Sequence, residues 1–583
     1  MVKRGFSFLV MGQMLLMTCM LTGALADEWQ RETAHKLAQR LQPPVVSEFQ
    51  SCRDPRFDLQ IALIRFYQHR EYALAWVDRY GLLPEGAMAL AVVKRAGRRG
   101  LLYADYHNPL LDDLLDGITT RPVIIGAAFN GKQIQLDLVV TEMVLRYAWH
   151  RMMGRIDPDM VNYGGASGKE PARDLAVALA EALESGRLDH FLEQLGPQHA
   201  AYRALQKSLP RYQRIKSAGG WSAIDDGPAL ESGDCGLRVA QLRNRLSVSG
   251  DIHRSTELKA DCFDDRLAAA VAEFQRRHGL NADGVAGART LAALNISVEE
   301  RIRQIQLNLE RWRWMPDELG SRYVLANIPG FQMQMVEAGH VVKTMRTIVG
   351  KKDRPTPVLS SMITYLEINP YWYVPSKIAR EDLLPKIQGN PNFLVRQNFR
   401  VFDSWDADAR EIDPFTVDWA SLSEEHFPFR LRQEPAARNA LGRVKFMFPN
   451  EQSVYIHDTP SKGLFKKTSR PFSSGCVRLE EPLALVSLLL GGQDWDQVRL
   501  SDAVASNQRQ VIILDEPVPV YLVYLTAWVE EDGETYFGED IYGHDQALFS
   551  ALAKNTAERA ACNNELRRPI YLGGLQEGRV DTP

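Results

Sequence analysis

The sequence predicts a multidomain α+β protein, and three observations carry that prediction. The chain has 583 residues, whereas a single hydrophobic core usually stops growing at about 250 to 300 residues. Apolar residues recur at helical spacing over the first part of the chain and alternate from about residue 321 onward, which indicates helices followed by strands. Residues 219–233 are rich in glycine, aspartate and serine, which is typical of a linker. We therefore expect a helical region, a compact unit and a β-rich domain.

The first residues have the pattern of an export signal. Lys3 and Arg4 precede a mostly apolar stretch over residues 6–21, and residues 24–26 read Ala-Leu-Ala, a small-x-small cleavage site. We predict a signal peptide over residues 1–26. The alternative is an uncleaved membrane anchor, because the apolar stretch approaches the length that spans a bilayer. Either reading exports the bulk of the chain.

Residues 27–230 are expected to form a helical scaffold. Two apolar stripes repeat at spacings of three and four, one over residues 136–147 and one over residues 175–183. Such stripes are usually packed cores, so no chemistry is assigned to them. The formal net charge of -4 is spread along the sequence without a long basic run, which argues against nucleic acid as a partner.

A compact helical unit is expected over residues 231–297. Helical faces recur around residues 239–246 and 270–275, and an Asp283-Gly284 pair and Gly287 separate later segments. This series resembles the small three-helix peptidoglycan-binding domain of many wall enzymes. The resemblance implies binding to glycan strands or stem peptides, while the alternative is a bundle that only packs. Residues 298–320 are expected to form a connecting helix.

The β-rich domain is expected over residues 321–517. Five segments alternate with the period of strands, at residues 323–328, 331–336, 362–368, 444–448 and 511–514. Residues 377–440 have mixed periodicity and many Pro, Asp and Arg residues, so we interpret them as an inserted subdomain or lid. Residues 518–583 form a C-terminal extension with an expected hairpin around residues 521–545, which would extend the catalytic sheet or pack on the scaffold.

The cysteine count indicates one free thiol. Removal of a signal would leave Cys52, Cys235, Cys262, Cys476 and Cys562, and an odd number in an oxidising compartment favours one unpaired cysteine with a function. If Cys476 is that thiol, four remain for two bridges. Cys235 with Cys262 is the favoured pair, because both lie in one small unit, although spacing alone does not fix the pairing.

The strongest chemical signal is a histidine at a strand end followed by a cysteine loop. His457 lies in Tyr-Ile-His-Asp-Thr-Pro, and the loop reads Ser473-Ser474-Gly475-Cys476-Val477-Arg478. The pattern permits a Cys476–His457 pair in which the imidazole takes the thiol proton. The amides of Gly475 and Cys476 are expected to face a developing oxyanion. Pro482 suits the first turn of a helix, so we expect Cys476 just before a helix whose positive end, with Arg478, favours the thiolate.

These motifs resemble the YkuD-type L,D-transpeptidase catalytic domain. Residues 349–351 and 369–375 and the pair Leu441-Gly442 also look like that family. The order of scaffold, peptidoglycan-binding unit, catalytic domain with lid and extension is similar to the large periplasmic L,D-transpeptidases of the YcbB type. One departure is Ser474, which stands where many members carry a loop histidine.

The resemblance implies a reaction and a location. Cys476 would attack the third residue of a tetrapeptide stem, usually diaminopimelate, and release D-alanine as a thioester forms. An amine of a neighbouring stem would then give a 3-3 cross-link. The implied partners are peptidoglycan stem peptides and glycan strands, with other wall-synthesis enzymes as further partners, in the periplasm. A membrane is a partner only if the signal is retained. No metal or nucleotide cofactor is expected, because metal-binding and phosphate-cradling motifs are missing from the sequence.

Several assignments stay open at this stage. Arg478 would hold a carboxylate or brace the loop, Ser474 would contact the substrate, and Asp458 would orient His457 or remain a solvated acid. Trp372 and Tyr373 would line the donor groove, although aromatic residues in a strand are usually core.

Three rival functions also remain. Water resolving the thioester would make an L,D-carboxypeptidase, and a different amine would attach a protein to the wall. A noncatalytic peptidoglycan-binding scaffold is the alternative of another class.

Overall fold

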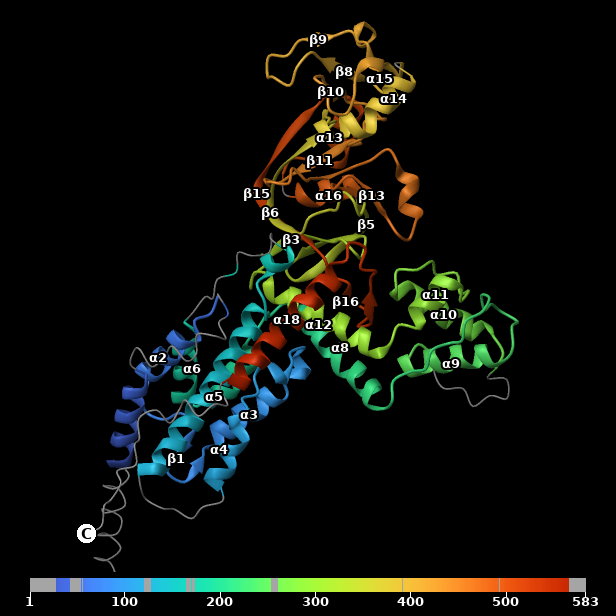
Figure 1. Ribbon diagram of the computed structural model, residues 1–583. Coiled ribbons are helices and arrows are strands. Elements are labelled where there is room, and N and C mark those ends of the chain that lie inside the picture. The colour runs from blue at the N-terminus through green and yellow to red at the C-terminus, as the bar shows by residue number, and fades with distance from the viewer. Residues whose placement is uncertain are drawn as a thin grey trace, which may run out of the picture.

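The computed structural model describes residues 28–41, 54, 56–119, 127–163, 169, 174–252, 261–390, 392–491 and 493–565. The predicted signal peptide and Cys52 lie outside these residues. Figure 1 shows an elongated helical region at one end, a β-rich domain that projects away from it and carries the inserted subdomain, called the lid below, at its far end, and a small helical unit to one side. Among the described helices, none has the length and apolar character needed to cross a membrane. The multidomain α+β fold class is therefore confirmed.

The scaffold is helical, as the apolar stripes predict. A helix over residues 28–40 precedes α2 (Leu59–His69), α3 (Pro84–Lys94), α4 (Leu110–Thr119), α5 (Ala127–Met153), α6 (Leu175–Glu184) and α7 (Leu188–Gln194), with a small β1 (Val77–Asp78) and β2 (Gly81–Leu82) pair. The predicted stripes of α5 and α6 are buried in one core. Inside that core, the carboxylate of Asp137 accepts the backbone N–H groups of Ala75 and Trp76 and the Tyr67 hydroxyl proton.

A pair of long helices links the scaffold to the rest of the chain. These are α8 (Ala200–Ser217) and α12 (Val298–Trp314), which share a core. The residues expected to form a simple connecting helix therefore form a central, mostly buried one. Its buried Arg313 pairs with Glu310, and its buried Arg311 pairs with Asp545 of α18 (His544–Glu565). The C-terminal helix α18 thus returns to the scaffold (Figure 1).

The compact unit contains three helices, α9 (Leu237–Ser249), α10 (Asp265–Arg277) and α11 (Ala288–Leu294), around its own core. The expected disulfide between Cys235 and Cys262 is confirmed. Gly284 has the positive φ expected for its turn, at +75°, and its N–H donates to the side chain of Gln275.

A nine-stranded sheet forms the centre of the β-rich domain, and it closes on itself. The strand order is β13-β5-β14-β12-β11-β6-β15-β3-β4, and β4 pairs back onto β5. The strands are β3 (Arg322–Asn327), β4 (Gln332–Glu337), β5 (His340–Gly350), β6 (Leu359–Ile368), β11 (Val444–Met447), β12 (Ile456–His457), β13 (Pro471–Ser473), β14 (Val477–Leu479) and β15 (Gln510–Val523). All five segments predicted as strands are confirmed. Helices α16 (Pro482–Leu489) and α17 (Gln497–Ala505) follow the site loop.

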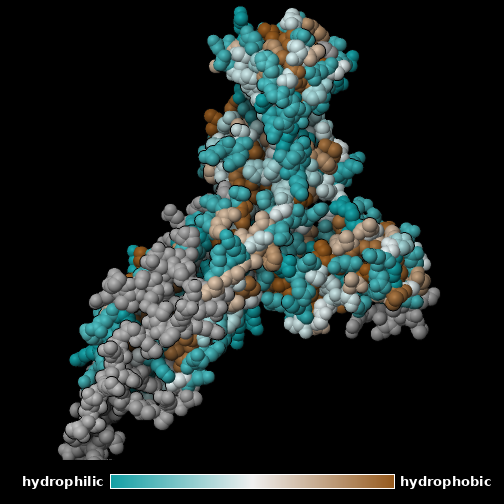
Figure 2. All heavy atoms as spheres, viewed as in Figure 1, coloured by the Kyte–Doolittle hydropathy of each residue, from teal (hydrophilic) through white to brown (hydrophobic). Residues whose placement is uncertain are grey.

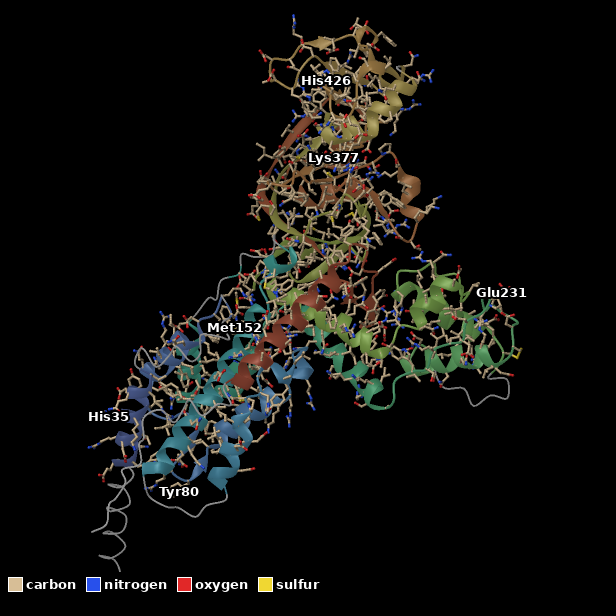
Figure 3. The ribbon with its side chains drawn as sticks, in the orientation of Figure 1. His35, Tyr80, Met152, Glu231, Lys377 and His426 are labelled. Carbon is tan, nitrogen blue, oxygen red and sulfur yellow. A yellow bond between two sulfur atoms is a disulfide. The ribbon has the colours of Figure 1, made fainter. Side chains whose placement is uncertain are left out.

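The insert is a subdomain with its own sheet and core. Its sheet has the order β7-β10-β8-β9, with β7 (Trp372–Tyr373), β8 (Phe399–Phe402), β9 (Glu411–Ile412) and β10 (Arg430–Gln433), and its helices are α13 (Ser376–Ile378), α14 (Leu384–Gly389) and α15 (Asn392–Arg396). Eleven buried residues form a separate core there. The chain enters through β7 and leaves through β10, which pair with each other. The subdomain therefore begins at Trp372, before the predicted residue 377. Lys377 and His426 mark it in Figure 3.

The expected C-terminal hairpin is present as β16 (Ala527–Val529) and β17 (Thr535–Phe537). It forms its own two-stranded sheet and packs on α8 and α12, so it belongs with the scaffold rather than the catalytic sheet. The surface seen in Figure 2 is mostly hydrophilic, with hydrophobic residues in scattered patches.

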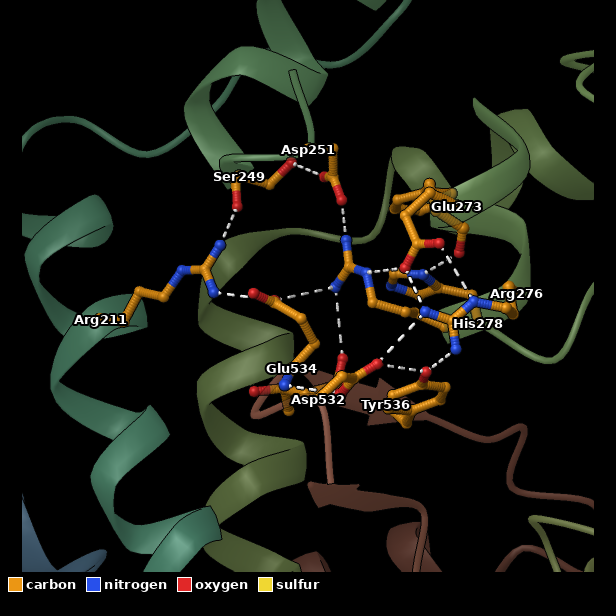
Figure 4. Close-up of polar contacts among 12 residues, drawn as sticks. Arg211, Ser249, Asp251, Glu273, Arg276, His278, Asp532, Glu534 and Tyr536 are labelled. Atoms are coloured by element: carbon orange, nitrogen blue, oxygen red, sulfur yellow. Dashed lines mark hydrogen bonds and ion pairs between the residues drawn. The ribbon is translucent and has the colours of Figure 1, made fainter. Parts of the chain in front are cut away.

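An ionic clasp joins the three-helix unit to this hairpin (Figure 4). Arg276 of α10 pairs with Asp532 at 3.2 Å and contacts the Tyr536 hydroxyl. Arg211 of α8 pairs with Glu534 at 3.0 Å. Because three separate parts of the chain meet here, the clasp holds the three-helix unit against the hairpin and α8.

Candidate active site

The site lies on the outer face of the closed sheet, and strand alternation places it there. Val477, Ile456, Phe446 and Leu366 are buried in the core, so their neighbours along each strand face outward. Register pairing aligns five outward residues in one row across β14, β12, β11, β6 and β15, namely Arg478, His457, Lys445, Glu367 and Val511. Cys476 precedes Val477 and so faces the same side as Arg478. The sheet therefore brings the predicted cysteine and histidine to one surface.

The loop that carries Cys476 is held by its neighbours. The Thr356 hydroxyl donates to the Gly475 carbonyl at 2.7 Å, and the Ser473 hydroxyl donates to the Cys476 carbonyl at 2.5 Å. Gly475 has φ +115°, a conformation that residues with a Cβ rarely adopt. Cys476 is half-buried and is the free cysteine among the described residues.

The expected pair of oxyanion donors is only partly available in this geometry. The Gly475 N–H donates to Ser473 Oγ at 3.2 Å, so it is engaged within the loop. Within the described part of the chain, no such bond is seen for the Cys476 N–H. The Gly475 role remains a prediction that requires this amide to leave Ser473.

The expectation that Cys476 sits just before a helix is wrong. Strand β14 follows it directly, and α16 begins only at Pro482, which does occupy the first turn. The expected preference for thiolate also fails, because burial raises the pKa of the Cys476 thiol. Hydrogen bonds from Tyr455 and the charges of Lys445 and Arg478 act in the opposite direction.

His457 is held as a neutral imidazole. Its Nδ1 lies 2.5 Å from the Asp458 carbonyl oxygen, which only accepts, so Nδ1 carries the proton and Nε2 keeps its lone pair. Burial lowers the pKa of His457 to about 3, and the charges of Arg478 and Lys445 add to this. No hydrogen bond joins His457 to Cys476 among the described residues, so the resting side chains share a face without direct contact.

Asp458 orients His457 through its backbone rather than its carboxylate. The carboxylate accepts the Arg443 N–H at 2.8 Å and pairs with Lys462 at 2.6 Å. Gly442 packs so closely that a Cβ there would lie 2.3 Å from the Asp458 carboxyl group, and its φ is +61°. The reading of Asp458 as a solvated acid is therefore wrong, because the side chain is buried and paired.

Tyr455 is a central residue that sequence reasoning did not assign. Its side chain lies beside the Cys476 thiol and the Trp372 side chain, and both neighbours act on its pKa, which burial raises. Its ring packs edge-on to His457 with centroids 5.5 Å apart and carries the Lys445 ammonium at 4.1 Å from its centroid. The sequence feature that could have identified Tyr455 is its position two residues before His457, on the same face of the strand.

Arg354 is a second unassigned residue, and it connects the loop to the lid. Its guanidinium donates to Ser474 Oγ at 3.1 Å and pairs at 2.5 Å with both Glu381 and Asp382 of the lid. Ser474, exposed and placed where many family members have histidine, is thus held by an arginine.

The remaining predicted residues divide into near and distant ones. Trp372 reaches the site through Tyr455 and also packs near Phe399 in the lid. Tyr373 is 55% exposed and pairs in register with Arg432 of the lid. Arg478 lies beside His457, and its buried Nε has no hydrogen-bond partner among the described residues. The substrate-binding roles of these residues remain predictions.

Comparison with known protein families identifies three parts of the chain. Residues 321–513 match the L,D-transpeptidase catalytic domain of the YkuD family, and this segment contains the whole site described above. The chain contains an L,D-transpeptidase catalytic domain. Residues 61–209 match the scaffold domain, and residues 236–294 match the domain described as "Putative peptidoglycan binding domain". The sequence resemblances to both the catalytic and the peptidoglycan-binding domains are therefore confirmed.

A curated relative supports the L,D-transpeptidase assignment. A Haemophilus influenzae protein named "Putative L,D-transpeptidase" is 37% identical over 253 residues, which is 43% of this chain and 50% of that protein. The matched segment thus spans only half the length of the relative.

Solved structures also match at low similarity. An L,D-transpeptidase from Mycobacterium smegmatis has a TM-score of 0.18 and 13% identity, covering 35% of this chain and 58% of that one. One from Xylanimonas cellulosilytica has a TM-score of 0.17 and 16% identity, covering 51% and 99%. Scores this low carry no further argument.

Proposed function

We propose that the protein is an L,D-transpeptidase that forms 3-3 peptidoglycan cross-links through a thioester on Cys476. The observation that carries this proposal is a free, half-buried cysteine on the same outer sheet face as a neutral histidine, within an L,D-transpeptidase domain. Neutral imidazole is the form that accepts a proton, and a protonated thiol needs such a base.

In the first step, His457 Nε2 takes the thiol proton as Cys476 Sγ attacks the carbonyl of the third stem residue. The C–S bond forms and the Cys476 N–H holds the oxyanion of the tetrahedral intermediate. The imidazolium then gives its proton to the amide nitrogen as the C–N bond breaks, which leaves the thioester and releases D-alanine. A side-chain movement must first bring the two groups into contact, because no hydrogen bond joins the resting imidazole and thiol among the described residues.

In the second step, the amine of a neighbouring stem attacks the thioester. His457 removes a proton from that amine as the new amide bond forms. The C–S bond then breaks, and the imidazolium returns the proton to the sulfur, which regenerates the thiol and the neutral base. Because the imidazole pKa is about 3, His457 is neutral at neutral pH and its lone pair is available to accept a proton.

The three-helix unit and the predicted signal are consistent with peptidoglycan as the substrate. We assign the three-helix unit to peptidoglycan, because it matches a peptidoglycan-binding domain. The predicted signal over residues 1–26 supports export, so we place the protein in the periplasm, with a membrane contact only if that signal is retained.

The test is incubation of the full mature chain and its Cys476→Ala variant with a disaccharide tetrapeptide containing diaminopimelate. Intact-protein mass reports the thioester, and chromatography reports the products. A wild-type adduct with cross-linked dimers, both missing in Cys476→Ala, is expected. An adduct that yields only tripeptide would assign carboxypeptidase activity instead. Binding to purified wall without adduct or product would identify a noncatalytic scaffold.

A further inference from the structure

The Lys445 ammonium is a charged group beside the site with unused hydrogen-bond donors. Lys445 is partly buried on β11. Among the described residues, its ammonium has one close contact, the ring face of Tyr455 at 4.1 Å, and no hydrogen bond or ion pair. An ammonium carries three donors, and a charge-assisted hydrogen bond to an anion is among the stronger hydrogen bonds in proteins. The ammonium therefore has hydrogen-bond donors available for an anionic ligand.

The nearest carboxylate does not satisfy this lysine. Glu367 is the register partner of Lys445 on β6, yet its carboxylate pairs with Arg509 at 2.8 Å. On the other side of Lys445 lies His457, followed by Arg478, whose Nε is also without a partner in the described part of the protein. The cations here are Lys445, Arg478 and Arg509, and the carboxylate is that of Glu367. The surface around the imidazole therefore has an excess of positive charge, which favours an anion.

The position of Lys445 relative to the thiol restricts which anion fits. The Lys445 ammonium lies over the ring of Tyr455, and the same tyrosine side chain lies beside the Cys476 thiol, so that each of these two groups acts on the other's pKa. One tyrosine therefore spans the distance between the nucleophile and the cation. In a tetrapeptide donor, the terminal carboxylate carbon is only two bonds from the nitrogen of the scissile amide. It is the anionic group that must lie closest to the attacking sulfur on the leaving-group side.

We propose that Lys445 binds the terminal carboxylate of the donor stem peptide and thereby selects donors that end at the residue being released. This inference rests on the proposed transpeptidase function and adds the group that recognises the C-terminal carboxylate of the donor. A stem with an additional residue would present a neutral amide where Lys445 requires a carboxylate. A charge-assisted hydrogen bond also fixes the leaving residue before the sulfur attacks.

The experiment compares two donors that differ only at this carboxylate. The first is the disaccharide tetrapeptide with a free terminal carboxylate, and the second is the same compound with a terminal carboxamide. The rate of thioester formation is measured by intact-protein mass for the full mature chain and its variants. The variants are Lys445→Met, Lys445→Arg, Arg478→Met and Lys343→Met. Lys343 is the matched control, because it is a lysine of the same domain that pairs with Glu481 at 2.8 Å.

The wild type is expected to acylate about 10- to 100-fold faster with the acid than with the amide, since a hydrogen bond to a charged group has that effect. Lys445→Met should lose this preference, so that the ratio of the acid rate to the amide rate falls toward one. The ratio is the readout because the Lys445 charge also acts on the pKa of Cys476 and of His457, and so affects both donors alike. Acylation of the variant by the amide donor would show that the site is still folded. Lys445→Arg should keep part of the preference, and Lys343→Met all of it.

Three results would overturn the proposal. Lys445→Met could keep the wild-type preference, or the preference could vanish in Arg478→Met instead, which would move the anchor to Arg478. The third is measured with an additional donor, in which the diaminopimelate side-chain carboxylate is amidated and the terminus is free. A Lys445→Met defect that disappears with this donor would mean that Lys445 binds the diaminopimelate carboxylate rather than the terminal one. If the wild type forms no adduct with either donor, the transpeptidase proposal itself fails, and the role of Lys445 with it.

Discussion

The resting state of Cys476 can be tested by the pH dependence of its alkylation. Burial raises the pKa of the thiol above its ordinary value of 9.0, and burial also keeps His457 neutral. The two side chains are therefore expected to rest as thiol and imidazole rather than as a thiolate–imidazolium pair. The perturbation is a change of pH from 6 to 8 in the presence of iodoacetamide, which reacts with the thiolate.

The magnitude follows from the direction in which the thiol pKa is shifted. A thiol whose pKa exceeds 9.0 is less than about 1% ionised at pH 7, and its thiolate fraction rises about tenfold with each pH unit. Alkylation of Cys476 should thus accelerate about 100-fold between pH 6 and pH 8. An ion pair would instead keep the thiolate fraction constant over that range.

The assay is intact-protein mass against time at each pH. Cys476→Ala supplies the background from other cysteines. In His457→Gln the slope should persist, because a neutral imidazole contributes no charge that stabilises a thiolate. A wild-type rate that is level between pH 6 and pH 8, or one that collapses in His457→Gln, would refute the reasoning.

Three further predictions concern the loop, the histidine and the disulfide. Thr356→Val removes the hydroxyl that donates to the Gly475 carbonyl. It should lower the free energy of unfolding, measured by urea denaturation, by about 1 to 3 kcal/mol, and it should slow acylation. Unchanged acylation would show that this bond does not shape the loop. The lowered pKa of His457, about 3 in the fold, means that its contribution to stability is complete above the unfolded pKa of about 6.5 and declines by up to about 1.4 kcal/mol per pH unit as pH falls toward the folded value. Hydrogen exchange of strand β12 at pH 7 and pH 5 should show this decline in the wild type and a smaller one in His457→Gln, and equal declines would contradict it. Replacing both Cys235 and Cys262 by serine removes a disulfide between residues 27 positions apart. This change should destabilise the three-helix unit by about 2 to 4 kcal/mol, seen as a lower melting temperature of that unit. An unchanged melting temperature would mean that its hydrophobic core alone determines its stability.

The sequence predicted the residues whose roles can be recognised from their neighbours along the chain. Cys476 and His457 stand out because a thiol preceded by small polar residues and glycine makes poor core. The alternation of apolar residues over 444–448 and 511–514 also predicted strands that the structure contains. Local patterns of this kind depend on neighbours along the chain, and these are known from the sequence.

The residues that were missed depend on pairing between strands. Lys445 lies beside His457 only because β11 and β12 pair in one particular register, and nothing in either short segment specifies that register. Arg354 reaches Ser474 across 120 positions of chain. The error at Cys476 has a similar origin, because β14 has only three residues, too few for alternation to be recognised before the helix at Pro482.

The pairing of β7 with β10 has a consequence for how this lid can change over evolution. Tyr373 and Arg432 are direct register partners, so the chain leaves the catalytic domain and returns to it at nearly one point. A segment with adjacent ends and its own core can be lengthened, shortened or exchanged without moving the strands that it interrupts. The lid is in this sense a replaceable module, whose size can vary among relatives while the chemistry beneath it stays the same.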